Sequence, residues 1–510
     1  MRHSVKILYL LIITFLWTSC QEDYLDTVPT DATATGTIFA TTEAAALAIN
    51  GLCKLTTRQY LGSQGFNGEG TIKMYYGNYP GNHFFVNLPG WAPIINSTYN
   101  ESITSTYLYY PWYYYYQLIG NANAIIVNID NATGLESEKE FIKAQALTFR
   151  AYSFMMMAQL YGYRWSDSNG GATGGLVLRL DTSTDGMPLS TLKETYDQIY
   201  ADLDEAIKLY TSSGKTRAEN DNYSPDIRTA YATYARAALN RQDYSVAATN
   251  ATKARVDHPL MDLSEYKKGF STPNSEWIWS CYGASDETLY YYSYQAYIAY
   301  NSSAGAVRST PKCISKILYE QLPETDIRRN FFLDPTGYTY TNGSGAASKE
   351  LDAYARTLYP ELQSNATVYA YMQFKIKAND QPGVGHLNNF RSSEMYLIEA
   401  EANYFLGNES GAQNLLQELN KDTGRDPAYS CDKTGSDLLD EIKFYRAIEL
   451  WGEGFDWFDA KRWGDTISRT GTDKGGNFIT ALAVTITPES GNKWTWKLPQ
   501  RETDYNDLLK

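Results

Sequence analysis

The residues that most often carry out chemistry in proteins are few in this chain and lie far apart. Its 510 residues contain four histidines, of which His83, His258 and His386 each stand alone. We find no H-E-x-x-H, G-x-S-x-G or G-x-x-x-x-G-K pattern, so zinc protease, serine hydrolase and P-loop chemistry have no support. Glycoside hydrolysis needs only two carboxylates and leaves little trace in a sequence, so motif absence does not exclude it.

Binding is better represented than catalysis. The chain contains 44 tyrosines against 18 phenylalanines. Tyrosine combines a flat apolar ring with a hydroxyl that can stay hydrogen-bonded, so it suits surfaces that stack on a polar ligand and remain soluble. Many of these rings are expected in the core instead. The composition therefore favours a binding surface for polar molecules without locating it.

The first twenty residues resemble the signal of a bacterial lipoprotein. Arg2 and Lys6 precede an apolar run from Ile7 to Trp17, which is too short to span a bilayer as a mature helix. The segment ends at Cys20, where the resemblance to a lipobox implies lipidation of the cysteine and removal of residues 1–19. Acyl chains contribute about 0.8 kcal/mol per buried methylene, enough to hold a soluble domain on a membrane. The alternative is an ordinary secretory signal with a coincidental cysteine.

Net charge and cysteine spacing argue against a nucleic-acid-binding protein and against a zinc site with paired cysteines. Without Arg2 and Lys6 the chain keeps 42 basic and 58 acidic residues, or about sixteen net negative charges, which argues against nucleic acid as a partner. The remaining cysteines are too far apart for paired zinc-ligand spacing, and no metal or other cofactor is predicted. Disulfides and buried thiols are both open for these residues: Cys53, Cys281, Cys313 and Cys431.

Helical periodicity dominates the middle of the chain. Apolar residues recur at steps of three and four over 195–210, with Thr191 and Glu194 as a predicted capping box. Ser224 and Pro225 predict the start of a second helix, and a polar turn at Gln242 and Asp243 leads to a third. Short turns between helices with small-residue faces indicate hairpins stacked like tetratricopeptide repeats.

We expect these repeat helices at about 106–161, 192–254 and 388–465. The stretches between them are rich in Gly, Ser, Asn, Thr and aromatic residues, mainly 62–105 and 262–387. Loops of that length usually carry function. Within them, Trp277 and Trp279 stand two apart in a strand-like run, which predicts that both face one side and belong to the core.

Several motifs in the same order resemble one family. Residues 445–464, YRAIELWGEGFDWFDAKRWG, and residues 143–162, KAQALTFRAYSFMMMAQLYG, are similar to signature helices of the SusD/RagB family. Further similar stretches are TLKETYDQIYADLDEAI at 191–207, the alanine-rich 226–241, Asp326 to Arg329, and RSSEMYLIEAEANYFLG at 391–407. Departures are Tyr163 to Trp165, where many relatives have a Gly-Asp-Val-Pro-Leu turn, and a loosely similar C-terminus.

The resemblance implies a mainly α, SusD-like fold for a single domain at 20–510, with tetratricopeptide-like helical hairpins and an irregular, aromatic-rich loop subdomain. Relatives meet ligand with an aromatic arc from two loops. The first loop here offers His83 among others, and the second lies ahead of the Asp326 to Arg329 run. The predicted ligand-binding residues are Glu69, Tyr75, Tyr76, Asn78, Trp91, Tyr282, Tyr290, Tyr291, Tyr292 and Tyr294.

By the same resemblance, the protein is a non-catalytic lipoprotein on the outer membrane of Bacteroidota-type bacteria. It would bind glycans and deliver them to a SusC-like TonB-dependent transporter. Gln21, Glu22 and Asp23 resemble the surface-export signal of such lipoproteins. Alternatives are peptide capture as in the RagB branch, a surface glycan hydrolase, and a purely structural gating lid. The charged and aromatic residues of the signature at 445–464 are interpreted as structural.

Overall fold

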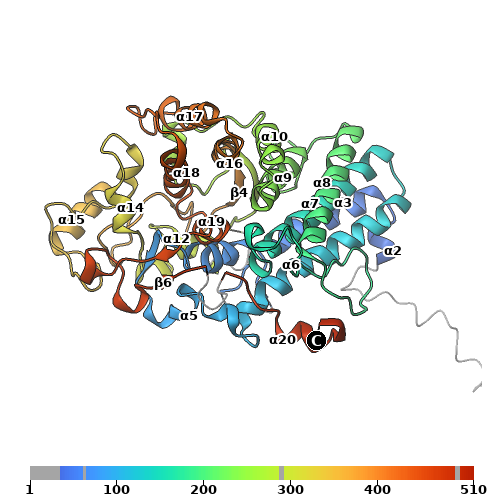
Figure 1. The fold of residues 1–510 in the computed structure, drawn as a ribbon, viewed down its shortest axis with the longest axis horizontal. Coiled ribbons are helices and arrows are strands. Elements are labelled where there is room, and N and C mark those ends of the chain that lie inside the picture. The colour runs from blue at the N-terminus through green and yellow to red at the C-terminus, as the bar shows by residue number, and fades with distance from the viewer. Residues whose placement is uncertain (1–34, 61–64, 286–291, 489–493, 510) are drawn as a thin grey trace, which may run out of the picture.

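The computed structural model describes residues 35–60, 65–285, 292–488 and 494–509, and most of its regular structure is helical, as predicted (Figure 1). Cys20, the expected signal peptide at 1–19, Tyr290 and Tyr291 lie outside these residues. The helices up to residue 254 are α2 (Thr35–Ile38), α3 (Thr42–Leu55), α4 (Glu69–Thr71), α5 (Ala92–Ile95), α6 (Thr106–Asn128), α7 (Glu136–Tyr161), α8 (Leu192–Ser213), α9 (Ile227–Arg241) and α10 (Tyr244–Ala254).

The later helices are mostly short until the C-terminal block. They are α11 (Leu263–Tyr266), α12 (Tyr294–Ile298), α13 (Gly305–Arg308), α14 (Lys316–Glu320), α15 (Lys349–Leu358), α16 (Ser392–Phe405), α17 (Glu409–Gln417), α18 (Gly435–Glu449), α19 (Asp456–Trp463) and α20 (Gln500–Thr503). A π-helix, η3 (Ile72–Asn78), follows α4, and another, η10 (Glu418–Asp422), follows α17.

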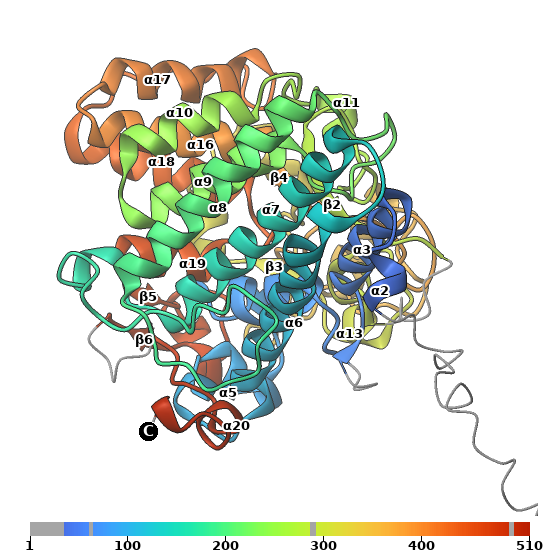
Figure 2. The same cartoon turned by 90° about the vertical axis from the view of Figure 1, so that its right-hand side faces the viewer.

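The long helices pack in sequence as hairpins. α7 packs against both α6 and α8, and α9 packs against both α8 and α10 (Figure 2). α10 then packs against α16, although about 140 residues separate them in sequence. The two helical blocks therefore form one continuous array, and the intervening segment 262–387 lies to its side.

The helix caps follow the predictions with one correction. The Thr191 hydroxyl accepts from the Glu194 N–H at 3.1 Å, and the Glu194 carboxylate accepts from the Thr191 N–H at 2.8 Å, which is the predicted capping box. The second helix does not begin at Ser224. Asp226 is its cap, because its carboxylate accepts from the Thr229 N–H at 2.9 Å.

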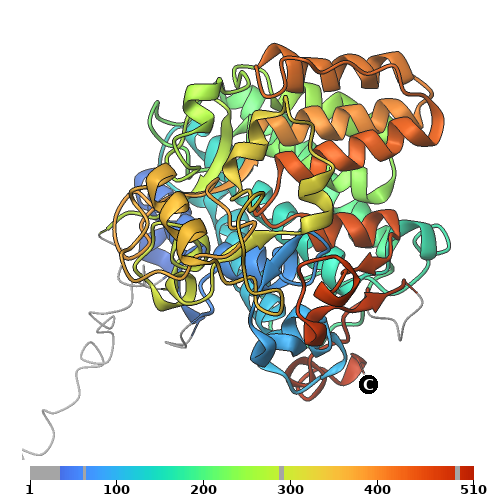
Figure 3. The same cartoon turned by 90° about the vertical axis from the view of Figure 1, so that its left-hand side faces the viewer.

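Away from the repeats, short strands join segments that are distant in sequence. In the described part of the chain they form three antiparallel pairs: β1 (Phe84–Val86) with β3 (Lys312–Ile314), β2 (Trp277–Cys281) with β4 (Leu387–Arg391), and β5 (Ile467–Ser468) with β6 (Thr485–Ile486). The first pair joins the two predicted ligand loops. Figure 3 shows these loops side by side, in blue and yellow to orange.

The prediction for Trp277 and Trp279 is half right. Both are buried in β2, but Trp279 belongs to the main hydrophobic cluster and Trp277 to a smaller one with Tyr266 and Phe270. The pairing of β2 with β4 shifts register between the two residues, so they do not share a face.

One hydrophobic cluster includes residues from Phe39 to Trp496 and so links both ends of the described chain. Cys53, Cys281, Cys313 and Cys431 carry free thiols, and all but Cys53 are buried. None of the described helices has the length and apolarity that crossing a membrane requires.

Candidate functional site

Five of the predicted ligand residues are core residues. Glu69, Tyr75, Tyr76, Asn78 and Tyr294 are each at most 6% exposed, so their burial does not support an open aromatic face at these residues. The prediction assumed that a loop rich in aromatic residues would expose their side chains to solvent. Residues 69–78 instead form α4 and η3, which are buried throughout.

Glu69 holds this segment against the repeat helices. Its carboxylate accepts hydrogen bonds from the hydroxyls of Tyr114 at 3.1 Å, Tyr115 at 3.4 Å and Tyr152 at 2.9 Å. Complete burial raises the pKa of Glu69, and the three hydroxyls offset only part of that effect. Glu69 therefore fixes α4 to α6 and α7.

Three more of these residues are fastened by hydrogen bonds to backbone. The Tyr76 hydroxyl donates to the Tyr107 carbonyl at 2.7 Å. The Asn78 amide donates to the Gly452 carbonyl at 2.7 Å and accepts from the Gly454 N–H at 2.9 Å, and the Tyr294 hydroxyl also donates to the Gly452 carbonyl. Both predicted loops are thus anchored to the turn after α18.

Partly exposed rings surround this buried base. Trp91 packs on Tyr75 with ring centroids 5.2 Å apart and on Tyr107 at 6.4 Å. Tyr107 stacks on Tyr99 at 4.7 Å with an interplanar angle of 23°. We call Trp91, Tyr99, Tyr107 and Tyr297 the aromatic cluster; all four are half-buried.

Tyr297 brings the second loop into the aromatic cluster. The Tyr75 hydroxyl donates to the Tyr297 hydroxyl at 3.1 Å, and the two rings meet edge to face at 5.9 Å. Trp91 comes from the first loop and Tyr297 from the second, so the cluster combines both predicted segments. Half-exposed indole and phenol rings can stack on the apolar face of a sugar while their polar atoms stay wet.

Sequence reasoning found Trp91 but missed its three companions in the aromatic cluster. Tyr107 lies at the start of α6, where helical periodicity masked its partial exposure. Tyr99 and Tyr297 each stand within ten residues of a predicted residue, Trp91 and Tyr292 respectively. That proximity was the only available signal.

The other predicted aromatics lie elsewhere. Tyr282 is half-buried and packs edge to face on Tyr223, with centroids 5.0 Å apart, and on His386 at 5.4 Å. Tyr292 is half-buried, and its backbone carbonyl accepts from the Asn67 amide.

The signature at 445–464 contributes to a buried ion-pair network. Arg391 at the end of β4 pairs with Glu276 at 2.7 Å, with Glu449 at 2.8 Å and with Glu453 at 2.8 Å. Burial would raise the pKa of Glu449, but the guanidinium groups of Arg425, Arg391 and Arg328 hold it well below its usual value. For Glu449 and Glu453 the structural interpretation is confirmed.

A metal centre finds no support in the geometry. Among the described residues, no group of three or more His, Cys, Asp and Glu side chains is placed to hold a metal ion.

Comparison with known families decides the identity of the fold. The family model described as SusD family matches residues 214–509, more than half of the chain. The chain belongs to the SusD family. A second family model, described as "Starch-binding associating with outer membrane", matches residues 65–239. No curated protein matches by sequence.

Solved structures agree on the SusD fold. A SusD-like carbohydrate binding protein from Bacteroides vulgatus has a TM-score of 0.75 and 22% identity, covering 92% of this chain and 98% of its own. A SusD superfamily protein from Bacteroides thetaiotaomicron has a TM-score of 0.71 and 20% identity, covering 92% and 99%. Another from Bacteroides vulgatus has a TM-score of 0.73 and 20% identity, covering 92% and 98%.

Proposed function

We propose that this SusD family protein is a non-catalytic, cell-surface lipoprotein that binds glycans at the aromatic cluster and delivers them to a SusC-like TonB-dependent transporter. The observation that carries the proposal is the aromatic cluster itself, in which Trp91 and Tyr297 from separate loops share the buried base Tyr75. A rigid base holds the ring faces in place before ligand arrives, which reduces the entropic cost of binding.

The comparisons support a carbohydrate role in general terms. The matched family model at residues 65–239, whose description refers to starch binding, includes Trp91, Tyr99 and Tyr107. One structural neighbour is described as a carbohydrate binding protein. Stacking on aromatic rings tolerates many sugars, so the geometry of the surrounding loops would determine which glycan binds.

The site favours modest affinity. A net binding free energy of about 4 kcal/mol from a few stacked rings corresponds to a dissociation constant of about 1 mM. Retention of a polymer would then depend on several simultaneous contacts, which raise the effective affinity without new interactions.

Membrane attachment and the transporter partner complete the proposal. Lipidation of Cys20 would tether the domain, and an array of helical hairpins can present an extended surface to a large partner. Mass spectrometry of the protein from membranes tests the anchor: the mature chain should begin at an acylated Cys20. Copurification of a TonB-dependent transporter tests the partner.

Calorimetric titration with soluble oligosaccharides tests the glycan site. The double variant Trp91→Ala/Tyr297→Ala should weaken the best ligand at least about fivefold, because it removes two stacking faces. Trp165→Ala/Tyr163→Ala is the matched control, since these residues lie in the loop after α7, where Trp165 packs on Tyr196. Unchanged affinity in the first variant would overturn the site. Shortened oligosaccharide would indicate a hydrolase, and competition by peptide alone would indicate peptide capture.

A further inference from the structure

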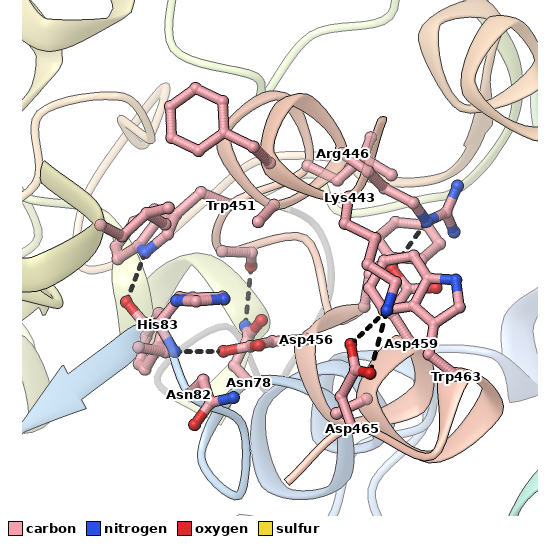
Figure 4. A pocket seen from close by; sticks show the side chains of 18 of the residues that line it. Asn78, Asn82, His83, Lys443, Arg446, Trp451, Asp456, Asp459, Trp463 and Asp465 are labelled. Atoms are coloured by element: carbon pink, nitrogen blue, oxygen red, sulfur yellow. Dashed lines mark hydrogen bonds and ion pairs between the residues drawn. The ribbon is translucent and has the colours of Figure 1, made fainter. Parts of the chain in front are cut away.

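A second hollow lies at the signature helices, apart from the aromatic cluster. A cavity of about 210 Å³ opens between α18, α19, α14 and the segment that leads into β1. None of Trp91, Tyr99, Tyr107 or Tyr297 lines it. Figure 4 shows Trp451 and His83 on one side of this cavity, Lys443 with Asp465 on the other, and Asp456 between them.

One wall of the cavity is apolar and firmly supported. Phe84, Leu318, Phe444 and Trp451 contribute to it. Trp451 stacks on Phe84 with centroids 5.0 Å apart, and its indole N–H donates to the His83 carbonyl at 2.9 Å. The wall therefore keeps its shape when the cavity is filled.

Most charged groups around the cavity are already paired. The Lys443 ammonium lies 2.8 Å from the Asp465 carboxylate, and Arg446 donates to Asp459 at 2.7 Å. The Lys443 charge is thereby paired, whereas Arg446 keeps one buried nitrogen, Nη1, without a hydrogen-bond partner among the described residues, so this nitrogen can donate to a ligand oxygen.

Other polar groups at the cavity are unused. One oxygen of Asp456 accepts the His83 backbone N–H at 2.6 Å, which leaves the second oxygen available. At the open side of the cavity lie the half-buried His83 and the exposed Gln321 and Asp440, whose side chains form no hydrogen bond with another described residue. The cavity thus offers carboxylate acceptors together with an imidazole and an amide, each able to donate or accept.

This combination of size and chemistry fits one neutral sugar ring. Pockets for drug-sized ligands measure about 300–1,000 Å³, so a cavity of about 210 Å³ suits a single ring rather than an oligomer. Ring hydroxyls need acceptors and donors at the edge, and the C–H face needs an apolar wall. We propose that this cavity, which we call the His83 cavity, binds one neutral monosaccharide unit independently of the aromatic cluster.

The test uses the purified full mature chain and saturation-transfer NMR with D-glucose, D-galactose, D-mannose and N-acetyl-D-glucosamine. At least one should bind at millimolar concentration. Ala447→Phe should weaken it at least about tenfold, because Ala447 lines the His83 cavity and the larger side chain fills it. Glucose 6-phosphate should bind more weakly than glucose, since Asp440 and Asp456 repel its phosphate.

Two further variants keep the outcome interpretable. His83→Ala/Gln321→Ala removes only side chains without partners in the described structure, so it should fold normally and weaken the sugar at least about threefold. Trp91→Ala/Tyr297→Ala lacks two rings of the proposed glycan site, so sugar binding measured in this background reports the His83 cavity. Absence of binding by all four sugars in this background, or binding there that survives the addition of His83→Ala/Gln321→Ala, overturns the proposal.

Discussion

The Arg391 guanidinium lies 2.8 Å from the Glu449 carboxylate, and both side chains are buried. The contact joins the end of β4 to the last turn of α18. Glu276 and Glu453 contact the same guanidinium, so one cation contacts three carboxylates from separate segments. Arg425 and Arg328 supply further positive charge at Glu449.

Replacing Arg391 should be severely destabilising. Arg391→Met leaves buried carboxylates without their shared partner, and breaking a buried pair in this way typically costs about 3–5 kcal/mol. Urea unfolding followed by circular dichroism measures the change. Arg228→Met is the matched control, because the Arg228 pair with Asp257 is exposed and should contribute less than about 1 kcal/mol. Equal losses in both variants would contradict the central role of Arg391.

Gly454 should accept a side chain less well than Gly407, another glycine with positive φ. Its φ of +91° lies in the left-handed region, and a Cβ atom there would stand 2.7 Å from the Cβ of Lys73. Gly407 also has a positive φ, +78°, but a Cβ there meets nothing within 4 Å. Gly407→Ala should therefore cost only the backbone strain of about 1–2 kcal/mol.

Gly454→Ala adds the steric clash to that strain, so it should lower the free energy of unfolding by at least about 1 kcal/mol more than Gly407→Ala. Thermal or urea unfolding of the two variants side by side gives the difference. If both glycines respond alike, close packing at the turn after α18 is not what restricts Gly454.

The buried Lys461 should make the free energy of unfolding depend on pH. Its ammonium donates to the carbonyls of Gln159 at 2.6 Å and Gly162 at 2.8 Å, and burial lowers its pKa to about 7 from 10.5. Between these values the unfolded chain binds more protons than the folded chain. The free energy of unfolding contributed by this group therefore rises with pH, by up to about 1.4 kcal/mol per unit.

Lys461→Met removes that contribution. From pH 7 to pH 9 the wild type should gain stability relative to the variant, as measured by urea unfolding at each pH. The quantity compared is the slope of the free energy of unfolding against pH. Groups that titrate in both proteins contribute equally to the two slopes, and a constant loss of stability caused by the substitution changes neither slope. Parallel pH profiles would show that Lys461 stays protonated in the folded state.

The hydroxyl and the ring of Tyr297 should matter differently. Tyr297→Phe removes only the hydrogen bond with Tyr75 and keeps the stacking face, so glycan affinity should fall less than about threefold. Tyr297→Ala removes the face and should cost about 0.5–1.5 kcal/mol, or roughly two- to tenfold. Calorimetry with the best oligosaccharide distinguishes them. A larger loss of affinity in Tyr297→Phe would mean that the ligand forms a hydrogen bond with the Tyr297 hydroxyl.

The sequence by itself determined the helical scaffold. Helix faces are local patterns, because residues three and four apart share a face whatever the rest of the chain does. The capping box at Thr191 and the helices α6 to α10 were therefore predictable, and the motif order indicated the SusD family that residues 214–509 confirm. The structural role of Glu449 and Glu453 followed from the same local reasoning.

Only the tertiary structure decided which aromatic rings reach the surface. Burial depends on what the rest of the chain packs over a residue, and no local pattern distinguishes a core tyrosine from a ligand-facing one. Tyr75 and Trp91 belong to the same predicted loop, 62–105, yet Tyr75 is the buried base of the aromatic cluster and Trp91 is half-buried at its open face. Tyr297 joined them from more than 200 residues away, because the pairing of distant strands and loops is set by the whole fold.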